Sequence, residues 1–344
     1  MTTVTTTSKR DPGPRPRPTS QAPVAYDVVT RGKLFPRPPF HFDGTFEKPS
    51  HFPTTLTRWA PGTFHQSIRI NGQLIGLKLS DSTSGVRPSI AVSMFFTRAL
   101  TRDESELVLQ ELTFRYALAE DLSAFRTLVY AQKMTTKTVF RRWMGTRAST
   151  PYSLYELLVV GLVLQNTHVR RSVQMLAALL DAFGQRLLFD GVALDALWHP
   201  QQLEDVGEEE LRELRIGYRA RALKRFSSQF AAGAIDERAL RELDDDELRA
   251  NLLTIYGVGP ETARILRSEA FHRPAAFDHL APWQQKIYSR LLYGEDGVSA
   301  RRILRDVRRT FGPYAGLATH VLWEDLFWRH RKAAIPWLAA ELRL

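Results

Sequence analysis

The sequence contains no cysteine and no long apolar run. Without cysteine the chain can form neither disulfides nor thiolate metal sites. Its longest apolar run, Leu157–Leu164, is far shorter than the roughly 20 residues with which a helix crosses a bilayer. Residues 1–23 contain no hydrophobic signal segment. We therefore expect a soluble cytoplasmic protein with neither a signal peptide nor a transmembrane segment.

Acidic residues are fewer than basic ones, which bears on the kind of partner. The chain of 344 residues has 47 Lys and Arg against 37 Asp and Glu, a formal net charge of +10. This balance favours a polyanionic partner such as nucleic acid, although basic charge also improves solubility. The length suffices for two or three domains with a sizeable core.

The N-terminal third divides into a tail and a region of β-type patterns. Residues 1–23 are rich in Thr, Pro and Arg, which predicts a disordered basic tail. Within 24–115, alternating apolar residues flank Asn71-Gly72, a strong hairpin signal. Further strands are predicted at Ser89–Thr97 and Leu107–Tyr116. We expect a small antiparallel β domain over 24–115.

From residue 116 to the end, at 344, the patterns are helical, so the predicted fold class is α+β and mainly α-helical. Leu154–Leu164 is apolar on every face, which predicts a buried central helix. It runs into Gln165, Asn166 and Thr167. These polar residues either face a ligand or cap helix ends.

A helix-hairpin-helix pattern at 249–270 is the most informative stretch. Gly257 and Gly259 permit a tight turn between two helices, and Thr262 lies in the first turn of the second helix. Backbone N–H groups at such a helix start have no partner within the helix and suit a phosphate. Asp278 follows beyond the second helix, 17 residues after Glu261.

Asp278 and the run of three aspartates at 244–246 each allow a second interpretation. Asp278 could be the N-cap of the next helix, because Asp is favoured there. Asp244-Asp245-Asp246 suggests a metal site, but successive helical residues point in different directions. We expect these three aspartates at a helix N-terminus, where the helix dipole favours negative charge.

The hairpin, its glycines and the trailing Asp278 resemble the helix-hairpin-helix DNA glycosylase superfamily. The N-terminal β region makes the chain most similar to the alkyl-base branch, the 3-methyladenine DNA glycosylases II (AlkA-like). The resemblance implies base excision repair, a partner in double-stranded DNA with damaged bases, and no cofactor or metal. A monomer is the default expectation. The iron–sulfur branch of the superfamily is excluded because its cluster needs four cysteines.

The resemblance also implies roles for individual residues. Asp278 matches the catalytic aspartate, and Gln165 and Asn166 match residues beside the space left by the extruded base. Gly257, Gly259 and Thr262 correspond to the DNA-binding turn. Basic residues on one helix face, Arg301 and Arg305, are expected to contact phosphates, and Tyr314 to line the base pocket.

At two positions this chain differs from other branches of the superfamily, and both differences predict the type of reaction. Superfamily members that also nick the strand have a lysine where Glu261 stands, so we expect a monofunctional enzyme. The adenine-removing branch has a glutamate where Gly161 stands, which protonates a neutral leaving base. Alkylated purines carry a positive charge already, so the sequence favours them. Two alternatives stay open, a glycosylase for oxidised or deaminated bases and a non-catalytic DNA-binding protein with this fold.

Overall fold

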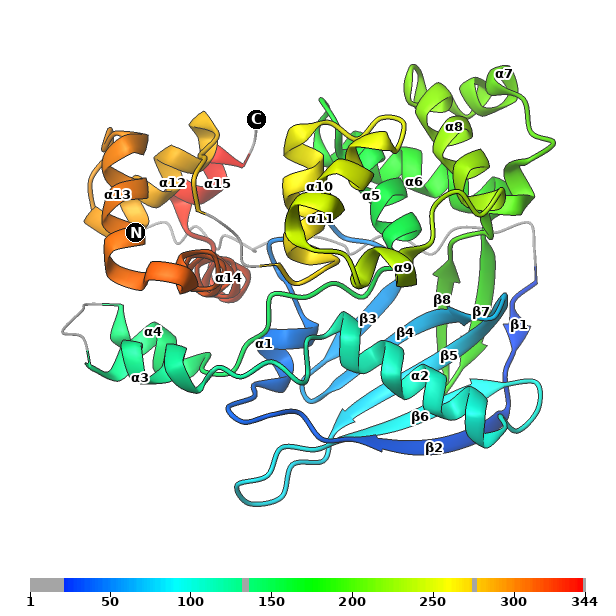
Figure 1. Cartoon of the computed structure of the whole chain (residues 1–344), viewed down its shortest axis with the longest axis horizontal. Helices are drawn as coiled ribbons and strands as arrows, with labels where there is room; N and C mark the ends of the chain where they lie inside the picture. Colours follow the sequence, from blue (N-terminus) through cyan, green and yellow to red (C-terminus); the bar gives the residue numbers. More distant parts are fainter. Residues whose placement is uncertain (1–21, 132–135, 274–276, 343–344) are drawn as a thin grey trace, which may run out of the picture.

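The fold is known from a computed structural model that describes residues 22–131, 136–273 and 277–342. Nearly all of the predicted tail, 1–23, lies outside these residues. Figure 1 shows a β-sheet layer with one group of helices above it and a second group to one side. The α+β class is confirmed. No helix in the described ranges is both long and apolar enough to cross a membrane.

The main sheet is antiparallel and has the strand order β2-β6-β5-β4-β3. Its strands are β2 (Val28–Leu34), β3 (Thr57–Ala60), β4 (Thr63–Ile70), β5 (Gln73–Asp81) and β6 (Ile90–Phe96). Asn71 and Gly72 join β4 to β5 with φ values of 48° and 77°, as a type I′ turn requires. This hairpin and the strand predicted at Ser89–Thr97 are confirmed.

The strand predicted at Leu107–Tyr116 is wrong, because this segment belongs to helix α2 (Arg102–Arg115). Thr101 and Glu104 form a capping box that starts the helix, a signal present in the sequence as T-x-x-E. Buried Val108 and Leu112, one helical turn apart, pack with the sheet in one hydrophobic cluster. The β region therefore contains a long helix against one sheet face.

The prediction of an entirely helical chain beyond residue 116 is also wrong. Strands β7 (Gln185–Phe189) and β8 (Val192–Ala196) form a hairpin, and β1 (Val24–Ala25) pairs with β7 in parallel. The turn residues Asp190 and Gly191 have φ values of 49° and 69°, and Asp-Gly is a hairpin signal that we overlooked. Phe189 packs onto the main sheet so closely that a Cβ added at Gly76 would lie 2.6 Å from its Cδ1.

One group of helices surrounds α5. Its members are α5 (Leu154–Leu164), α6 (Val169–Phe183), α7 (Glu208–Leu211), α8 (Arg219–Ala231), α9 (Glu237–Arg241), α10 (Asp245–Thr254) and α11 (Pro260–Glu269). Buried side chains from all of them form one hydrophobic cluster. The prediction of a buried central helix at Leu154–Leu164 is confirmed, and Ser153 starts it with a capping box.

A second group packs around α14. It comprises α3 (Ser123–Ala131), α4 (Lys137–Arg142), α12 (Pro282–Tyr293), α13 (Ala300–Phe311), α14 (Ala315–Lys332) and α15 (Pro336–Glu341). The short helix α1 (Phe42–Phe46) lies between the sheet and the chain that follows α4, as Figure 1 shows. The segment after α11, which includes Asp278, connects the two helical groups.

Candidate functional site

The hairpin between α10 and α11 has the geometry of an anion-binding turn. Gly257 has a φ of +88°, and a Cβ there would lie 3.2 Å from the Ala222 Cβ. Gly259 is the N-cap of α11 and brings no capping side chain. The first hydrogen bond within α11 runs from the Ala263 N–H to the Gly259 carbonyl, so the earlier N–H groups, including that of Thr262, point out of the helix end.

Asp278 lies in the connection between α11 and α12, with an exposed side chain. The N-cap of α12 is Ala281, so the alternative that Asp278 is the N-cap of this helix is wrong. Arg308 of α13 donates from Nε to the Phe277 carbonyl at 2.9 Å and thereby holds the backbone beside Asp278. The arrangement leaves the Asp278 carboxylate available to a ligand.

Helix α11 brings charged groups close to Asp278. Arg264 interacts electrostatically with both Asp278 and Glu269. It also donates from Nε to the Glu261 carboxylate at 3.0 Å, and this hydrogen bond lowers the pKa of Glu261. Glu261 is exposed and ionised at neutral pH. Position 261 therefore carries a carboxylate and has no amine that could attack a sugar.

The polar residues that end α5 lie beside the loop before α8. Gln165 is the C-cap of α5, and its carbonyl accepts a hydrogen bond from Arg219. Asn166 adopts a φ of 47°, the left-handed conformation in which Asn commonly ends a helix. Its Nδ2 donates to the Tyr218 hydroxyl at 3.4 Å, and both side chains are exposed. The backbone of Asn166 thus has a structural role, while its side chain is exposed beside that of Tyr218.

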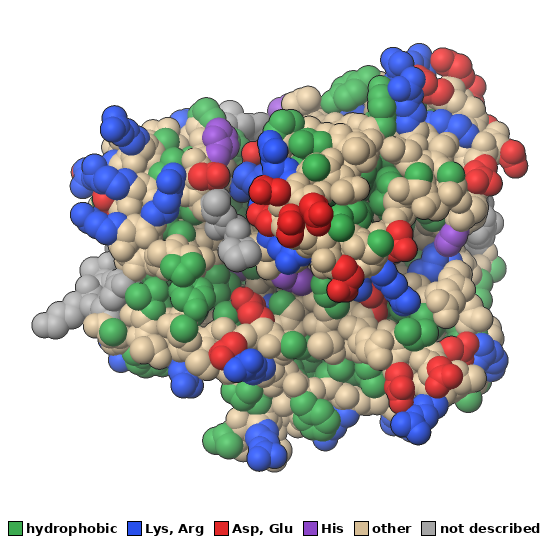
Figure 2. All heavy atoms as spheres, in the orientation of Figure 1, with side chains coloured by type: hydrophobic (Ala, Val, Ile, Leu, Met, Phe, Trp, Pro, Cys, Tyr) green, Lys and Arg blue, Asp and Glu red, His purple; other side chains and the backbone are tan. Residues whose placement is uncertain are grey.

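The predicted arginine stripe is on α13. Arg301 and Arg305 are exposed, and Arg305 donates to the Asp306 carboxylate at 3.1 Å. Figure 2 shows Lys and Arg side chains gathered over the part of this face where Figure 1 places α13, and acidic ones over α10 and α11. Asp244 caps α10 in a capping box, and Asp245 and Asp246 lie in its first turn, so the helix-start interpretation of the three aspartates is confirmed.

Tyr314 lies in an aromatic cluster beneath α13 and α14. Its ring centroid is 5.5 Å from that of Phe125, and it is half-buried. The same hydrophobic cluster includes Phe277 and Leu280, which flank Asp278 in the sequence. The position is compatible with a pocket wall near Asp278, and that role stays a prediction.

A group of titratable side chains near Asp278 was missed in the sequence. It comes from the segment after α1, from the C-terminal end of α11 and from α14, and its members are Lys48, His51, Glu269, His320 and Glu324. We refer to these five residues as the charged cluster. No motif connects them, because they lie in three segments far apart in sequence. Lys48 and Glu324 are buried, an environment that charged residues rarely occupy unpaired.

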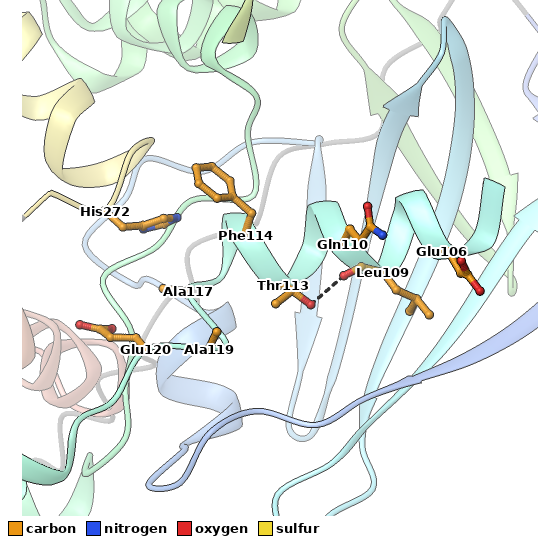
Figure 3. Close-up of a pocket in the computed structure, with 9 residues that line it drawn as sticks. All are labelled: Glu106, Leu109, Gln110, Thr113, Phe114, Ala117, Ala119, Glu120 and His272. Carbon is orange, nitrogen blue, oxygen red and sulfur yellow. Dashed lines mark hydrogen bonds between the residues drawn. The ribbon is translucent and has the colours of Figure 1, made fainter. Parts of the chain in front are cut away.

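A hollow with mainly apolar lining lies elsewhere on the described part of the chain. It has a volume of about 630 Å³ and runs along α2, as Figure 3 shows, between residues of that helix and His272. Burial lowers the pKa of His272 to about 4, so its ring is neutral. Neither Asp278 nor the hairpin turn lines this hollow, so we do not assign it to the site.

Comparisons with known proteins agree on the fold. No protein-family model matches the chain. A protein of Bacillus subtilis (strain 168) named "Putative DNA-3-methyladenine glycosylase YfjP" is 21% identical over 299 residues, which cover 86% of this chain and 98% of that protein. A 3-methyladenine DNA glycosylase structure from Archaeoglobus fulgidus matches with a TM-score of 0.67 and 18% identity, over 85% of this chain and 97% of that one.

An 8-oxoguanine glycosylase/lyase of Clostridium acetobutylicum also matches, with a TM-score of 0.58 and 18% identity, over 87% of this chain and 99% of that one. The same Clostridium protein has been solved with double-stranded DNA. The chain therefore has the fold of the helix-hairpin-helix DNA glycosylases, and the resemblance seen in the sequence is confirmed at that level.

Proposed function

We propose that the chain is a monofunctional DNA glycosylase of base excision repair. It would extrude a damaged purine from duplex DNA and hydrolyse the bond between base and sugar. The observation that carries the proposal is the position of Asp278, an exposed carboxylate beside Arg264 of a helix-hairpin-helix. A binding protein would need no carboxylate next to polyanionic DNA, so Asp278 argues against the non-catalytic alternative.

The location of the damaged base inside a duplex determines the steps that base removal requires. A base stacked in a duplex has to be flipped out, at a cost of a few kcal/mol. As the glycosidic bond breaks, the sugar becomes oxocarbenium-like, and an ionised carboxylate near C1′ stabilises that charge. In our proposal Asp278 supplies this carboxylate and activates or positions the attacking water. Asn166 and Tyr218 would occupy the space that the extruded base leaves.

Contacts to the DNA backbone would come from two places. The outward N–H groups of Glu261 and Thr262, in the first turn of α11, suit one phosphate, and the exposed arginines of α13 suit others. Such contacts hold distorted DNA without reading its sequence. They also make binding depend on salt, because each neutralised phosphate releases counterions.

The salt dependence gives a first prediction. We expect Arg301→Gln and Arg305→Gln each to reduce the slope of log K against log salt concentration by about 0.9. Fluorescence anisotropy with a labelled duplex between low and moderate salt measures the slope. Arg102→Gln on α2, an exposed arginine paired with Glu106, is the matched control and should leave it unchanged. Equal slopes for all proteins would exclude α13 from the DNA interface.

A second prediction concerns strand cleavage. A lyase forms a Schiff base between an amine and the sugar, and Glu261 cannot do so. We expect borohydride treatment of the protein with lesion DNA to trap no covalent complex, and the strand to stay intact until alkali is added. A trapped complex on a denaturing gel would show that another amine takes part and that the enzyme is bifunctional.

Among substrates, alkylated purines fit this chain best. They leave without acid assistance because they already carry positive charge, and Gly161 offers no proton. A Cβ added at Gly161 would meet no heavy atom within 4 Å, so packing does not require a glycine there. The likeness to a solved 8-oxoguanine glycosylase/lyase makes oxidised purines the second candidate. Release of free base from duplexes that carry each lesion separates the two.

A further inference from the structure

Asp278 is carried by a short stretch of backbone with little hydrogen bonding. Residues 277–280 belong to neither a helix nor a strand. Phe277 packs against Tyr288 of α12, with 5.4 Å between the ring centroids, and so anchors one end of the stretch. Within the described part of the chain, the backbone of 277–280 takes part in one hydrogen bond, and its donor is Arg308. The position of Asp278 therefore depends strongly on that contact.

The hydrogen bond acts on the peptide unit that leads into Asp278. Arg308 donates from Nε to the Phe277 carbonyl oxygen at 2.9 Å. A peptide unit is planar, so this oxygen moves together with the backbone nitrogen and Cα of Asp278. Holding the oxygen restricts where that Cα lies. Because the aspartate side chain is short, the same contact restricts its carboxylate.

Helix α13 gives Arg308 a firm support. One face of the helix is buried in the hydrophobic cluster that the Phe277 ring also contacts. The buried residues recur about once per helical turn, and they are Ile303, Val307 and Phe311. Arg308 follows directly after one of them and is exposed. Side chains on packed helices are positioned more accurately than those on loops.

The arginines of α13 differ in how their charge is matched. Asp306 lies within 4 Å of three of them, at 3.7, 3.1 and 3.6 Å, and these are Arg302, Arg305 and Arg309. No Asp or Glu oxygen of the described ranges lies within 4.0 Å of a nitrogen of Arg308. Its terminal nitrogens, Nη1 and Nη2, form no hydrogen bond with described residues. Arg308 therefore keeps its charge and two nitrogens for an anionic ligand.

We propose that Arg308 is a positioning residue that couples the binding of one DNA phosphate to the placement of Asp278. The inference rests on the proposed function. A guanidinium presents five N–H donors in a fixed plane, so Nε stays on the Phe277 carbonyl while Nη1 and Nη2 bind two oxygens of a phosphate. The phosphate then fixes the plane of the guanidinium. That plane in turn fixes the peptide unit before the catalytic carboxylate.

This role predicts an effect on rate that a simple phosphate contact does not have. A contact that is equally strong before and during bond cleavage changes affinity and leaves the rate constant of the bound complex alone. Arg308 acts on the position of Asp278, and a displacement of a catalytic group by about 1 Å can slow a reaction by about 10²-fold. Loss of the coupling should therefore lower the rate constant in DNA-saturated enzyme.

The first test is Arg308→Lys, measured as single-turnover base release with saturating enzyme from the lesion duplex that the wild type cleaves fastest. Lysine keeps the charge but has one nitrogen in place of a planar fork, so it cannot hold the carbonyl and a phosphate in the same geometry. We expect a rate constant about tenfold lower and an affinity close to that of the wild type. Arg98→Lys is the matched control, because Arg98 is an exposed arginine that donates to the Ala99 carbonyl. It should keep the wild-type rate constant.

A double-mutant cycle separates positioning from a general structural role. If Arg308 acts through the carboxylate of Asp278, Arg308→Lys should slow base release in the wild type and have no further effect in an Asp278→Asn background. A purely structural role would lower the melting temperature and slow both backgrounds by the same factor.

The phosphate is tested with duplexes in which one phosphate beside the lesion is replaced by a neutral methylphosphonate, one position at a time. At one position we expect the rate constant of the saturated wild type to fall about tenfold and that of Arg308→Lys to stay the same. The wild type and the variant then behave alike on that duplex, because each lacks one half of the same contact.

Three outcomes would overturn the inference. The first is a wild-type rate constant for Arg308→Lys, which would show that the contact does not position Asp278. The second is equal slowing in both backgrounds of the cycle. The third is the absence of any methylphosphonate position whose effect depends on Arg308. Failure of the proposed function shows separately, because the wild-type protein would then release no free base from any lesion duplex.

Discussion

Asp278→Asn should lower the single-turnover rate of base release by about 10²-fold or more, while affinity for lesion DNA changes little. Removing one group that stabilises the charge of a transition state typically slows an enzyme by this factor. Asparagine has nearly the same shape but no charge, so it cannot stabilise the sugar cation. It also removes repulsion between a carboxylate and phosphates, so binding is retained or improved.

The control for this prediction is a second exposed aspartate. Asp246, in the first turn of α10, is exposed and lies away from the turn of the hairpin. Asp246→Asn should leave the rate of release unchanged. Rapid-quench sampling with enzyme in excess gives the rates, and anisotropy gives the affinities. If Asp278→Asn released bases as fast as the wild type, Asp278 would not be the catalytic carboxylate.

Glu111→Ala should destabilise the chain by about 3–5 kcal/mol, the usual result of removing one partner from a buried ion pair. Glu111 of α2 accepts from Arg115 Nε at 2.8 Å and from both terminal nitrogens of Arg241 at 2.7 Å. Arg241 belongs to α9, so this network joins the helix on the sheet to the helices of the first group. Urea unfolding followed by circular dichroism measures the change.

The same network predicts an acid sensitivity. Burial opposes ionisation of Glu111, but the Arg241 and Arg115 guanidiniums outweigh it and hold its pKa at about 2. Its folded pKa lies below its unfolded value near 4.3. Its contribution to stability is therefore complete above that value and is lost as the pH falls toward 2.

The control for Glu111→Ala is Glu106→Ala. Glu106 pairs with Arg102 at the surface, so this variant should lose at most about 1 kcal/mol of stability at neutral pH. A similar loss of unfolding free energy in both variants would contradict the conclusion that the buried Glu111 network stabilises the fold.

Local signals in the sequence predicted much of the fold. The Asn71-Gly72 hairpin and the all-apolar helix Leu154–Leu164 depend on neighbouring residues, and both are confirmed. The two errors came from competing local signals. The apolar content of Leu107–Tyr116 suggested a strand, although the capping box at Thr101 specifies a helix. The Asp190-Gly191 turn was overlooked because helical patterns surround it.

The candidate site was only partly predictable, for a physical reason. The hairpin turn and Asp278 lie close together in the sequence, so a short motif contains both. The charged cluster depends on Lys48, Glu269 and Glu324, which tertiary packing brings together from three segments. In the sequence each of them resembles an ordinary surface residue. Their proximity becomes visible when the packing is known.

The most direct test of the account is to incubate the wild-type chain, in excess, with a duplex that contains a single 7-methylguanine, and to analyse the products. We predict free 7-methylguanine, detected by mass spectrometry, and a strand that breaks at the lesion after alkali and not before. Intact DNA with no free base, from this duplex and from duplexes with oxidised or deaminated purines, would contradict the central claim that Asp278 serves a DNA glycosylase.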